Sequence, residues 1–374
     1  MAGTLASLYL HFPFCETKCH YCDFYSIGRE RTSETDAPLF ERALRSEIEL
    51  QGHRLTPSLE SIFMGGGTPS MTPPDSMARA LEPLWKFTSI SERTEWTMEA
   101  NPSSVDAIKL REYQKIGVNR VSMGVQALRD DLLLKLGRVH SREKAFQALE
   151  AIFESGITNV SVDLLCGVPG QTVDDVERAM EELTRFPITH LSCYLLTLPT
   201  SHRMHRELPP ESGQLEHLLA IDRFMSGKGF EHYEISNFAK PGFQARHNLA
   251  YWKRQGYLGL GPSAHSFDPN TQPQTRWKNF SSLHRYSDTL KKGISPIEWT
   301  ESLDLEAGRL ETWMLALRLN EGFPAEWLAS SAQRQKASLL QQEGLLETHP
   351  LHPDRLRLTP RGFAVSDQII ATLS

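Results

Sequence analysis

The chain has 374 residues, of which 40% are hydrophobic and 23% are charged, and its formal net charge is −6. These values are typical of a folded globular protein, and the length allows roughly two to three domains. Because 46 acidic residues outnumber 40 basic ones, no positive excess indicates a nucleic-acid-binding protein. The chain shows no signal peptide and no run of about 18 apolar residues, which predicts a cytoplasmic protein without a membrane span.

The first predicted strand covers residues 7–12 and ends at Pro13. A loop with three of the five cysteines follows directly, at Cys15, Cys19 and Cys22. Three thiolates can hold three irons of a 4Fe-4S cluster and leave its fourth iron open. A zinc site is the alternative, and it would need a fourth ligand such as His11 or His20. A disulfide framework fits worse, because one of the three cysteines would stay unpaired.

Strands and helices alternate from residue 7 to about residue 197. The later strands are expected at residues 61–64, 95–99, 120–125, 160–165 and 188–196. Helical spacing of apolar residues separates them, first over residues 36–51. This alternation predicts an α/β fold with a parallel sheet, and about six units favour a partial (β/α)6 TIM-like barrel over a full eight-fold barrel.

Polar and glycine-rich stretches follow the ends of these strands. In such barrels the reactive groups collect at the carboxyl ends of the strands, so these stretches are expected on one rim with the cysteine loop. The candidate residues on this rim are Gly66, Gly67, Thr68, Glu99, Gln126 and Asp163. Each has a simpler interpretation, since glycines also form tight turns and a carboxylate can end a strand in solvent. Arg138 could pair with a carboxylate ligand, but an isolated arginine usually forms a surface salt bridge.

The pattern changes after residue 198. The range 238–295 shows little periodicity and is expected to be a connector between a barrel over residues 1–237 and a small winged-helix-like α+β domain over residues 296–374. The connector contains His247 beside two aromatic residues. Such a histidine could be an axial ligand of heme, although it is more often a hydrogen-bonded core residue.

Stretches along nearly the whole chain resemble the radical S-adenosylmethionine (SAM) superfamily and, within it, the oxygen-independent coproporphyrinogen III oxidase-like family. They include CxxxCxxC from Cys15 to Cys22, Gly65-Gly-Gly-Thr-Pro-Ser70, Met98-Glu-Ala-Asn-Pro102 and Tyr233-Glu-Ile-Ser-Asn-Phe-Ala-Lys240. The resemblance implies a 4Fe-4S cluster on the three cysteines, with SAM bound to the open iron. The residues it places beside SAM are Tyr9, Gly66, Gly67, Thr68, Glu99, Gln126, Arg138 and Asp163.

Two branches of this family compete. The oxidases carry a longer N-terminal segment and a further cysteine two residues after the third cluster ligand, where this chain has Phe24. The sequence instead resembles the heme-chaperone branch, whose HNxxYW heme-binding motif matches residues 247–252. This resemblance implies that the protein contacts heme through His247 and passes it to acceptor proteins, including membrane hemoproteins reached by peripheral contact.

Other functions stay open at this point. Oxidative decarboxylation of coproporphyrinogen III is the alternative, and a zinc-stabilised interaction protein is a third hypothesis. Whether the protein cleaves SAM as an enzyme is likewise undecided by the sequence.

Overall fold

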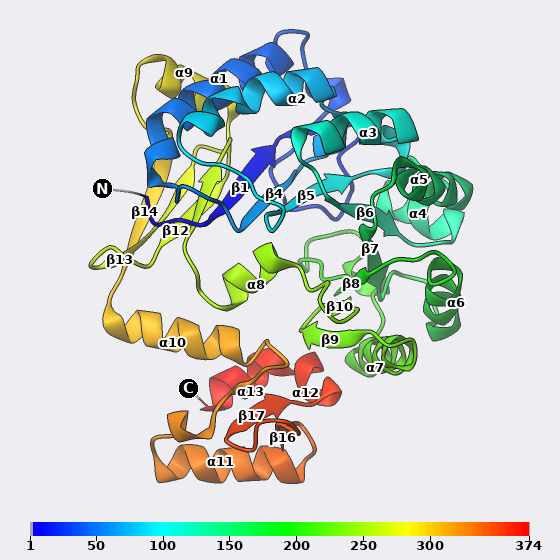
Figure 1. Ribbon diagram of the computed structural model, residues 1–374. Helices are drawn as coiled ribbons and strands as arrows, with labels where there is room; N and C mark the ends of the chain where they lie inside the picture. Colours follow the sequence, from blue (N-terminus) through cyan, green and yellow to red (C-terminus); the bar gives the residue numbers. More distant parts are fainter. Residues whose placement is uncertain (1–2, 374) are drawn as a thin grey trace. The chain divides into compact units, whose positions relative to one another are not determined.

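The computed structural model describes residues 3–373 (Figure 1). Contacts divide the chain into two compact units. The first unit contains Met1–Val162, Ala245–Tyr251 and Gln255–Asp304, and the second contains Asp163–Gln244, Trp252–Arg254 and Leu305–Ser374. These units cut across the ranges 1–237, 238–295 and 296–374, which stay a prediction about domains. Among residues 3–373, none of the helices combines the length and the apolar character that crossing a membrane requires.

A parallel sheet forms the centre of the first unit. Its parallel strands, in spatial order, are β11 (Tyr257–Leu260), β1 (Ser7–Phe12), β4 (Ser61–Gly66), β5 (Glu95–Ala100) and β6 (Arg120–Gln126). Most of their residues are buried, as in parallel sheets covered on both faces. The predicted strands of this unit and their parallel pairing are therefore confirmed.

The sheet of the first unit continues beyond β11 as an antiparallel extension. It consists of β12 (His265–Asp268), β13 (Gln274–Asn279) and β14 (Ile297–Leu303). The range 238–295, expected to be a connector with little periodicity, thus contains the strands β11, β12 and β13. Strand β12 has only four residues, and the six residues of β13 show no alternation of apolar and polar side chains, so tertiary pairing decides both.

Helices cover the parallel strands of the first unit. They are α1 (Asp36–Gln51), α2 (Pro74–Leu81), α3 (Ala107–Ile116), α4 (Asp130–Leu136), α5 (Arg142–Ser155) and α9 (Leu283–Lys291), while the short α8 (Arg246–Trp252) carries the HNxxYW stretch. In Figure 1, α1 lies between α2 and α9, with which it packs. Helix α1 buries Phe40, Leu44 and Ile48, which recur every four residues and form one face.

A buried carboxylate joins α1 to the antiparallel extension. Glu47 accepts hydrogen bonds from the Tyr286 hydroxyl at 2.6 Å, the Asn279 amide at 2.6 Å and the Gly261 backbone N–H at 2.7 Å. Burial raises the pKa of Glu47 from 4.5 to about 7, and these three donors offset only part of that shift. Because this pKa lies near 7, the carboxyl group of Glu47 titrates within the core near neutral pH.

The second unit contains two groups of strands. Strand β7 (Asn159–Cys166) enters it from Asp163 onward and is followed in the sheet by β8 (His190–Leu195), β10 (Asn237–Ala239) and β9 (Glu231–Glu234). Helices α6 (Val173–Leu183) and α7 (Glu211–Gly227) pack against each other.

The C-terminal part of the second unit has its own core. Helices α10 (Leu305–Ala316), α11 (Ser331–Gln342), α12 (Pro360–Ala364) and α13 (Ser366–Leu373) surround the small sheet β15 (Phe323–Pro324), β17 (Arg355–Leu358) and β16 (Leu346–Thr348). Phe323, Leu346, Leu358 and Leu373 are almost completely buried there. Strands β16 and β17 pair antiparallel as a hairpin.

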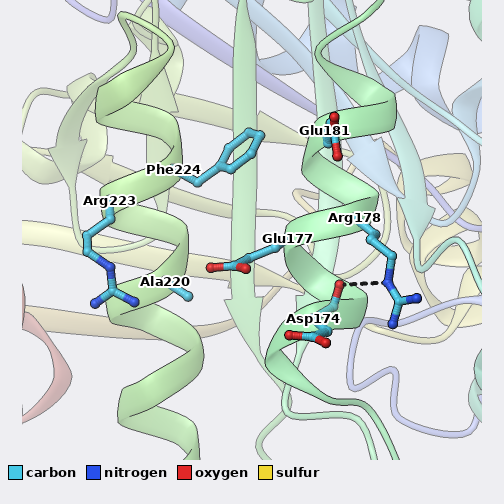
Figure 2. A pocket seen from close by; sticks show the side chains of 7 residues that line it. All are labelled: Asp174, Glu177, Arg178, Glu181, Ala220, Arg223 and Phe224. Carbon is cyan, nitrogen blue, oxygen red and sulfur yellow. Dashed lines mark hydrogen bonds between the residues drawn. The ribbon is translucent and has the colours of Figure 1, made fainter.

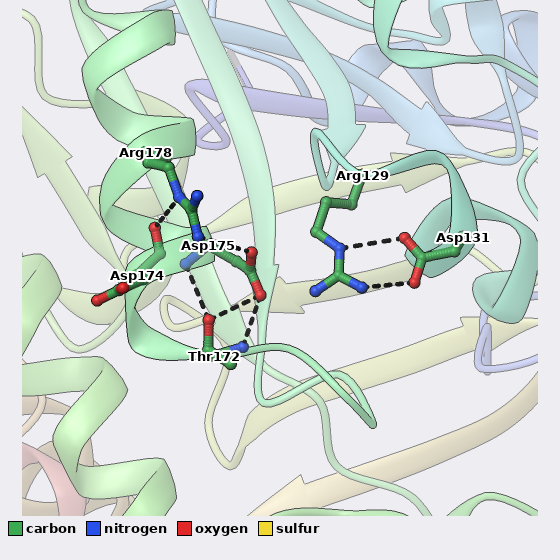
Figure 3. A network of polar contacts seen from close by, with 6 residues as sticks. All are labelled: Arg129, Asp131, Thr172, Asp174, Asp175 and Arg178. Atoms are coloured by element: carbon green, nitrogen blue, oxygen red, sulfur yellow. Dashed lines mark hydrogen bonds and ion pairs between the residues drawn. The ribbon is translucent and has the colours of Figure 1, made fainter.

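Helix starts follow ordinary capping chemistry (Figure 3). At α6, Thr172 Oγ1 accepts from the Asp175 N–H at 3.2 Å, and Asp175 accepts in return from the Thr172 N–H at 2.9 Å. At the start of α4 in the first unit, Arg129 donates to both carboxylate oxygens of Asp131, at 3.1 and 2.6 Å. The contacts at Thr172 form a capping box, whereas Arg129 makes no side-chain cap hydrogen bond.

Candidate functional site

The cysteine loop is closed at its base by a two-stranded ribbon. Strand β2 (Phe14–Cys15) pairs in parallel with β3 (Ile27–Gly28), and the Ile27 N–H donates to the Pro13 carbonyl at 2.7 Å. Within the loop, the Cys22 N–H donates to the Cys19 carbonyl at 3.3 Å. Backbone pairing therefore fixes both ends of the segment that carries Cys15, Cys19 and Cys22.

The three cysteines are free and only partly exposed. Burial raises the pKa of the Cys15 thiol, and the Thr68 hydroxyl, which donates to its Sγ at 3.5 Å, opposes this shift. Burial also raises the pKa of the Cys22 thiol, and negative charge on Cys19 would raise it further. Such thiols become thiolates readily only beside a strong positive charge, which the irons of a bound cluster supply.

A single metal ion fits this loop less well. Among residues 3–373, no three His, Cys, Asp or Glu side chains converge as ligands of one ion. His11 Nε2 instead contacts the Tyr25 carbonyl at 2.8 Å, and His20 Nδ1 lies 3.3 Å from the Lys135 carbonyl. An iron–sulfur cluster takes one thiolate per iron, so its ligands need not meet at one point. The donor set therefore fits a cluster better than a lone zinc ion.

Arg138 reaches the cysteine loop from the end of α4. Its Nη2 donates to Asn101 Oδ1 at 2.9 Å and to the Gly124 carbonyl at 2.7 Å, while Nη1 lies 3.6 Å from Cys19 Sγ. Its Nε is buried and has no hydrogen-bond partner within the described range. A buried guanidinium N–H is normally satisfied, so this arrangement fits an anionic ligand such as the carboxylate of SAM.

The glycine run after β4 packs its backbone against the strand that leads to the cysteines. The N–H groups of Gly67 and Thr68 donate to the carbonyls of Phe12 and Phe14, each at 2.7 Å. A Cβ on Gly67 would lie 2.7 Å from both of these carbonyl oxygens. Glycine is needed here for a close backbone approach, which places the Thr68 hydroxyl beside Cys15.

Glu99 and Tyr9 lie on the same rim. The Gly66 N–H donates to Glu99 Oε2 at 3.2 Å. Burial, with the negative charge of Glu99, raises the pKa of Tyr9, whose hydroxyl lies 3.1 Å from His11 Nδ1. The structure thus brings together Tyr9 on β1, Gly66 on β4 and Glu99 on β5.

Gln126 adopts an unusual backbone conformation at the end of β6. Its φ is 68°, in the left-handed region that residues other than glycine rarely enter. A Cβ on Gly124 would lie 3.0 Å from Gln126 Nε2 and 3.3 Å from Arg138 Nη2, so both side chains lie over this glycine. Strained backbone of this kind is found often at binding sites. Here the side chain of Gln126 lies beside that of Arg138.

His247 is enclosed in the core. Its side chain is fully buried, and its Nδ1 lies 2.9 Å from Ser61 Oγ while its Nε2 lies 2.8 Å from the Tyr251 hydroxyl. The ring stacks on Phe63 at 5.3 Å, and burial lowers its pKa to about 3. Both ring nitrogens thus have hydrogen-bond partners, and a heme contact through His247, which stays a prediction, would require one of these bonds to be given up.

Asp163 belongs to the second unit, as its first residue on β7, and is partly buried. All other predicted site residues lie in the first unit. Neither the hydrogen bond from Arg138 to Asn101 nor the one from His11 to the Tyr25 carbonyl was predicted. Asn101 does lie in the stretch Met98–Pro102, but a backbone acceptor leaves no signal in sequence.

The second unit has a shallow hollow between α6 and α7 (Figure 2). It measures about 500 Å³ and is lined mainly by charged side chains, among them Asp174, Glu177, Glu181 and Arg223. Charged residues of both signs on neighbouring helix faces are typical of a solvated surface. The chemistry of the chain is therefore concentrated at the cysteine loop.

Comparison with known proteins agrees with this site. The family model of the radical SAM superfamily matches residues 9–183. The coproporphyrinogen III oxidase (HemN) of Escherichia coli, a radical SAM enzyme, superposes with a TM-score of 0.82 over 99% of this chain and 90% of its own, at 20% identity. Fold and cysteine loop together define a radical SAM protein.

Two curated relatives show to which family of this superfamily the chain belongs. The heme chaperone HemW of Mycobacterium tuberculosis is 32% identical over 100% of this chain and 96% of its own length. That of Bacillus subtilis is 34% identical over 85% of this chain and 84% of its own. The chain therefore belongs to the HemW family of the radical SAM superfamily.

Proposed function

We propose that this protein is a cytoplasmic heme chaperone, which binds heme and passes it to acceptor proteins. The observation that carries this proposal is the similarity to heme chaperones over the whole chain, and not only over the superfamily domain. Heme is the cargo in this proposal. The cluster and SAM are resident groups, and membrane hemoproteins reached by peripheral contact are acceptors.

The first unit would hold the resident groups. Cys15, Cys19 and Cys22 would ligate a 4Fe-4S cluster, which supplies an open iron for SAM. The buried Nε of Arg138 supports a role in binding the SAM carboxylate. Gly66, Gly67, Thr68 and Glu99 would line the same ligand, together with Tyr9 and Gln126. Asp163 remains a further candidate for SAM binding.

The test is anaerobic reconstitution with iron and sulfide, followed by heme titration and by transfer of bound heme to an apo-hemoprotein. Tight heme binding with transfer supports the proposal, and absence of either rejects it. Cys19→Ser should abolish the broad visible absorbance of the cluster, whereas Cys166→Ala, at a buried cysteine outside the loop, should keep it.

A parallel assay separates the chaperone from the oxidase. The reconstituted protein is incubated with dithionite, SAM and coproporphyrinogen III. No vinyl product is expected, because Phe24 occupies the position of the additional cysteine of the oxidases. Substantial product would instead identify an oxidase.

A further inference from the structure

The chain makes a tight turn at the end of β6, with Gln126 at its centre. The Ala127 N–H donates to the Val125 carbonyl at 2.9 Å, which closes a three-residue γ-turn. Because the φ of Gln126 is 68°, this is the rare and strained form of the turn, in which the central residue has a positive φ. Such a conformation persists only where the surrounding structure holds it in place.

His140 makes a second hydrogen bond to this turn. Its Nε2 lies 3.1 Å from the Val125 carbonyl oxygen, which also accepts from the Ala127 N–H. A carbonyl can only accept, so Nε2 carries the proton, and the two lone pairs of the oxygen serve the two donors. Burial lowers the pKa of His140 to about 4, which keeps the ring neutral at pH 7.

This hydrogen bond is the one that the buried imidazole of His140 contributes. The side chain is only 5% exposed, and its Nδ1 has no hydrogen-bond partner among residues 3–373. Burying an unpaired ring nitrogen costs free energy, which an apolar side chain of similar size would avoid. The polar chemistry of His140 is therefore directed at the Val125 carbonyl alone.

Arg138 and His140 contact consecutive carbonyls of β6. Arg138 Nη2 donates to the Gly124 carbonyl at 2.7 Å, and His140 donates to the carbonyl that follows it. Val139 between them is 51% exposed, so the side chains on either side of it face the strand. The side chain of Gln126 lies over Gly124, next to Arg138 Nη2. The segment after α4 thus contacts both the SAM candidate Gln126 and the turn that carries it.

We propose that His140 is a positioning residue of the SAM site, which holds the Val125–Ala127 turn so that the Gln126 amide faces the ligand bound by Arg138. This role rests on the proposed SAM site, and His140 acts through the turn without touching SAM. When its hydrogen bond is removed, the strained turn should relax. Only the fraction of molecules that keeps the turn would then bind SAM with full affinity.

A matched pair of substitutions tests the hydrogen bond. His140→Gln keeps an N–H donor near the position of Nε2, whereas His140→Met has a similar length and no donor. In the reconstituted protein, His140→Met should weaken SAM binding by roughly five- to tenfold, and His140→Gln should restore most of the affinity. Val139→Met, at the exposed position of the same segment, is the control and should bind SAM like the wild type. Equal SAM affinity of His140→Met and the wild type would overturn the proposal.

Gln126→Gly tests the same turn without a change in the core. Glycine takes a positive φ without strain, so this variant should be at least as stable as the wild type, while it loses the amide contact with SAM. Adding His140→Met to Gln126→Gly should cause no further loss of SAM affinity, because both residues act through one turn. Full SAM affinity in Gln126→Gly, or a further loss as large as that of His140→Met alone, would contradict this role of His140.

The iron content and the visible absorbance of the cluster are measured for each variant. Both should equal those of the wild type, because the hydrogen bond of His140 goes to the end of β6 and not to the cysteine loop. Loss of the cluster in His140→Met would show that the histidine supports the loop, which also overturns the proposal. A wild-type protein that takes up the cluster but binds no SAM rejects the SAM site itself, which separates the two failures.

Discussion

The imidazole of His11 links Tyr9 to Tyr25, because its Nε2 lies 2.8 Å from the Tyr25 carbonyl and its Nδ1 lies 3.1 Å from the Tyr9 hydroxyl. A carbonyl can only accept, so Nε2 carries the proton and the Tyr9 hydroxyl donates to Nδ1. Burial lowers the pKa of His11 to about 4, which keeps the ring neutral at pH 7. The segment that follows the cysteine loop is thus hydrogen-bonded to β1 through Tyr25 and His11.

Gly66 gives a direct test of this packing. Its φ is 100°, and a Cβ would lie 2.4 Å from the His11 ring. Gly66→Ala should lower the free energy of unfolding by roughly 3 kcal/mol, through backbone strain and the displaced ring. Gly293→Ala is the control, since Gly293 has φ 71° and nothing within 4 Å of the added Cβ, and should cost only about 1 kcal/mol. Equal losses in chemical denaturation would contradict the close packing.

Arg138 is predicted to bind the carboxylate of SAM. Arg138→Gln should weaken SAM binding by about tenfold or more, because a charge-assisted hydrogen bond is lost, while the iron content stays near that of the wild type. Equilibrium dialysis of the reconstituted protein with labelled SAM measures this. Arg111→Gln, at an exposed position on α3, is the control. If SAM affinity is retained, Arg138 serves only the local contacts with Asn101 and Gly124.

The raised pKa of Glu47 predicts that the free energy of unfolding depends on pH. Its pKa rises from 4.5 to about 7 on folding, so the folded state holds a proton that the unfolded state has already released. The contribution of Glu47 is therefore most favourable below pH 4.5 and is lost progressively as the pH rises to about 7, by on the order of 3 kcal/mol.

The comparison with Glu47→Gln isolates this contribution. The difference in unfolding free energy between the wild type and the variant should change between pH 4.5 and 7 in favour of the variant, and then stay constant. Denaturant unfolding at several pH values measures it. A difference that does not depend on pH would show that Glu47 titrates normally.

His247→Ala tests the predicted heme contact and the packing around it. The change removes two hydrogen bonds and a stacked ring from the core, and we expect a loss of about 2–4 kcal/mol. Heme affinity, measured at a temperature where the variant is folded, should fall below that of the wild type. Unchanged heme affinity would show that His247 is not a heme contact.

Much of the fold could be predicted because its signals are local. The helix expected over residues 36–51 is found as Asp36–Gln51, since its apolar positions recur at helical spacing. Strands β11 and β12 were missed, because each has only four residues. The parallel pairing of β11 with β1 joins distant parts of the chain and has no local signature.

The residues of the candidate site likewise divide into those that have a signal in the local sequence and those that have none. Cys15, Glu99 and Arg138 stay predictions as site residues, and the sequence indicates them because few residue types supply the chemistry of a cluster ligand or of a polar ligand contact. The backbone acceptors of Arg138 and His11 were not predictable, since the carbonyls of Gly124 and Tyr25 are groups that any residue provides. The enclosure of His247 depends on Ser61, Phe63 and Tyr251 at once, which only the folded chain reveals.

The paired ends of the cysteine loop bear on how the protein matures. The ribbon of β2 and β3 joins Phe14 to Ile27 and Cys15 to Gly28, so the frame around the loop is made entirely by the polypeptide. Assembly of the cluster need then order only the eleven residues between Cys15 and Ile27, at positions 16–26. We expect that a protein released without iron keeps this frame, because none of the backbone pairs in it depends on the metal.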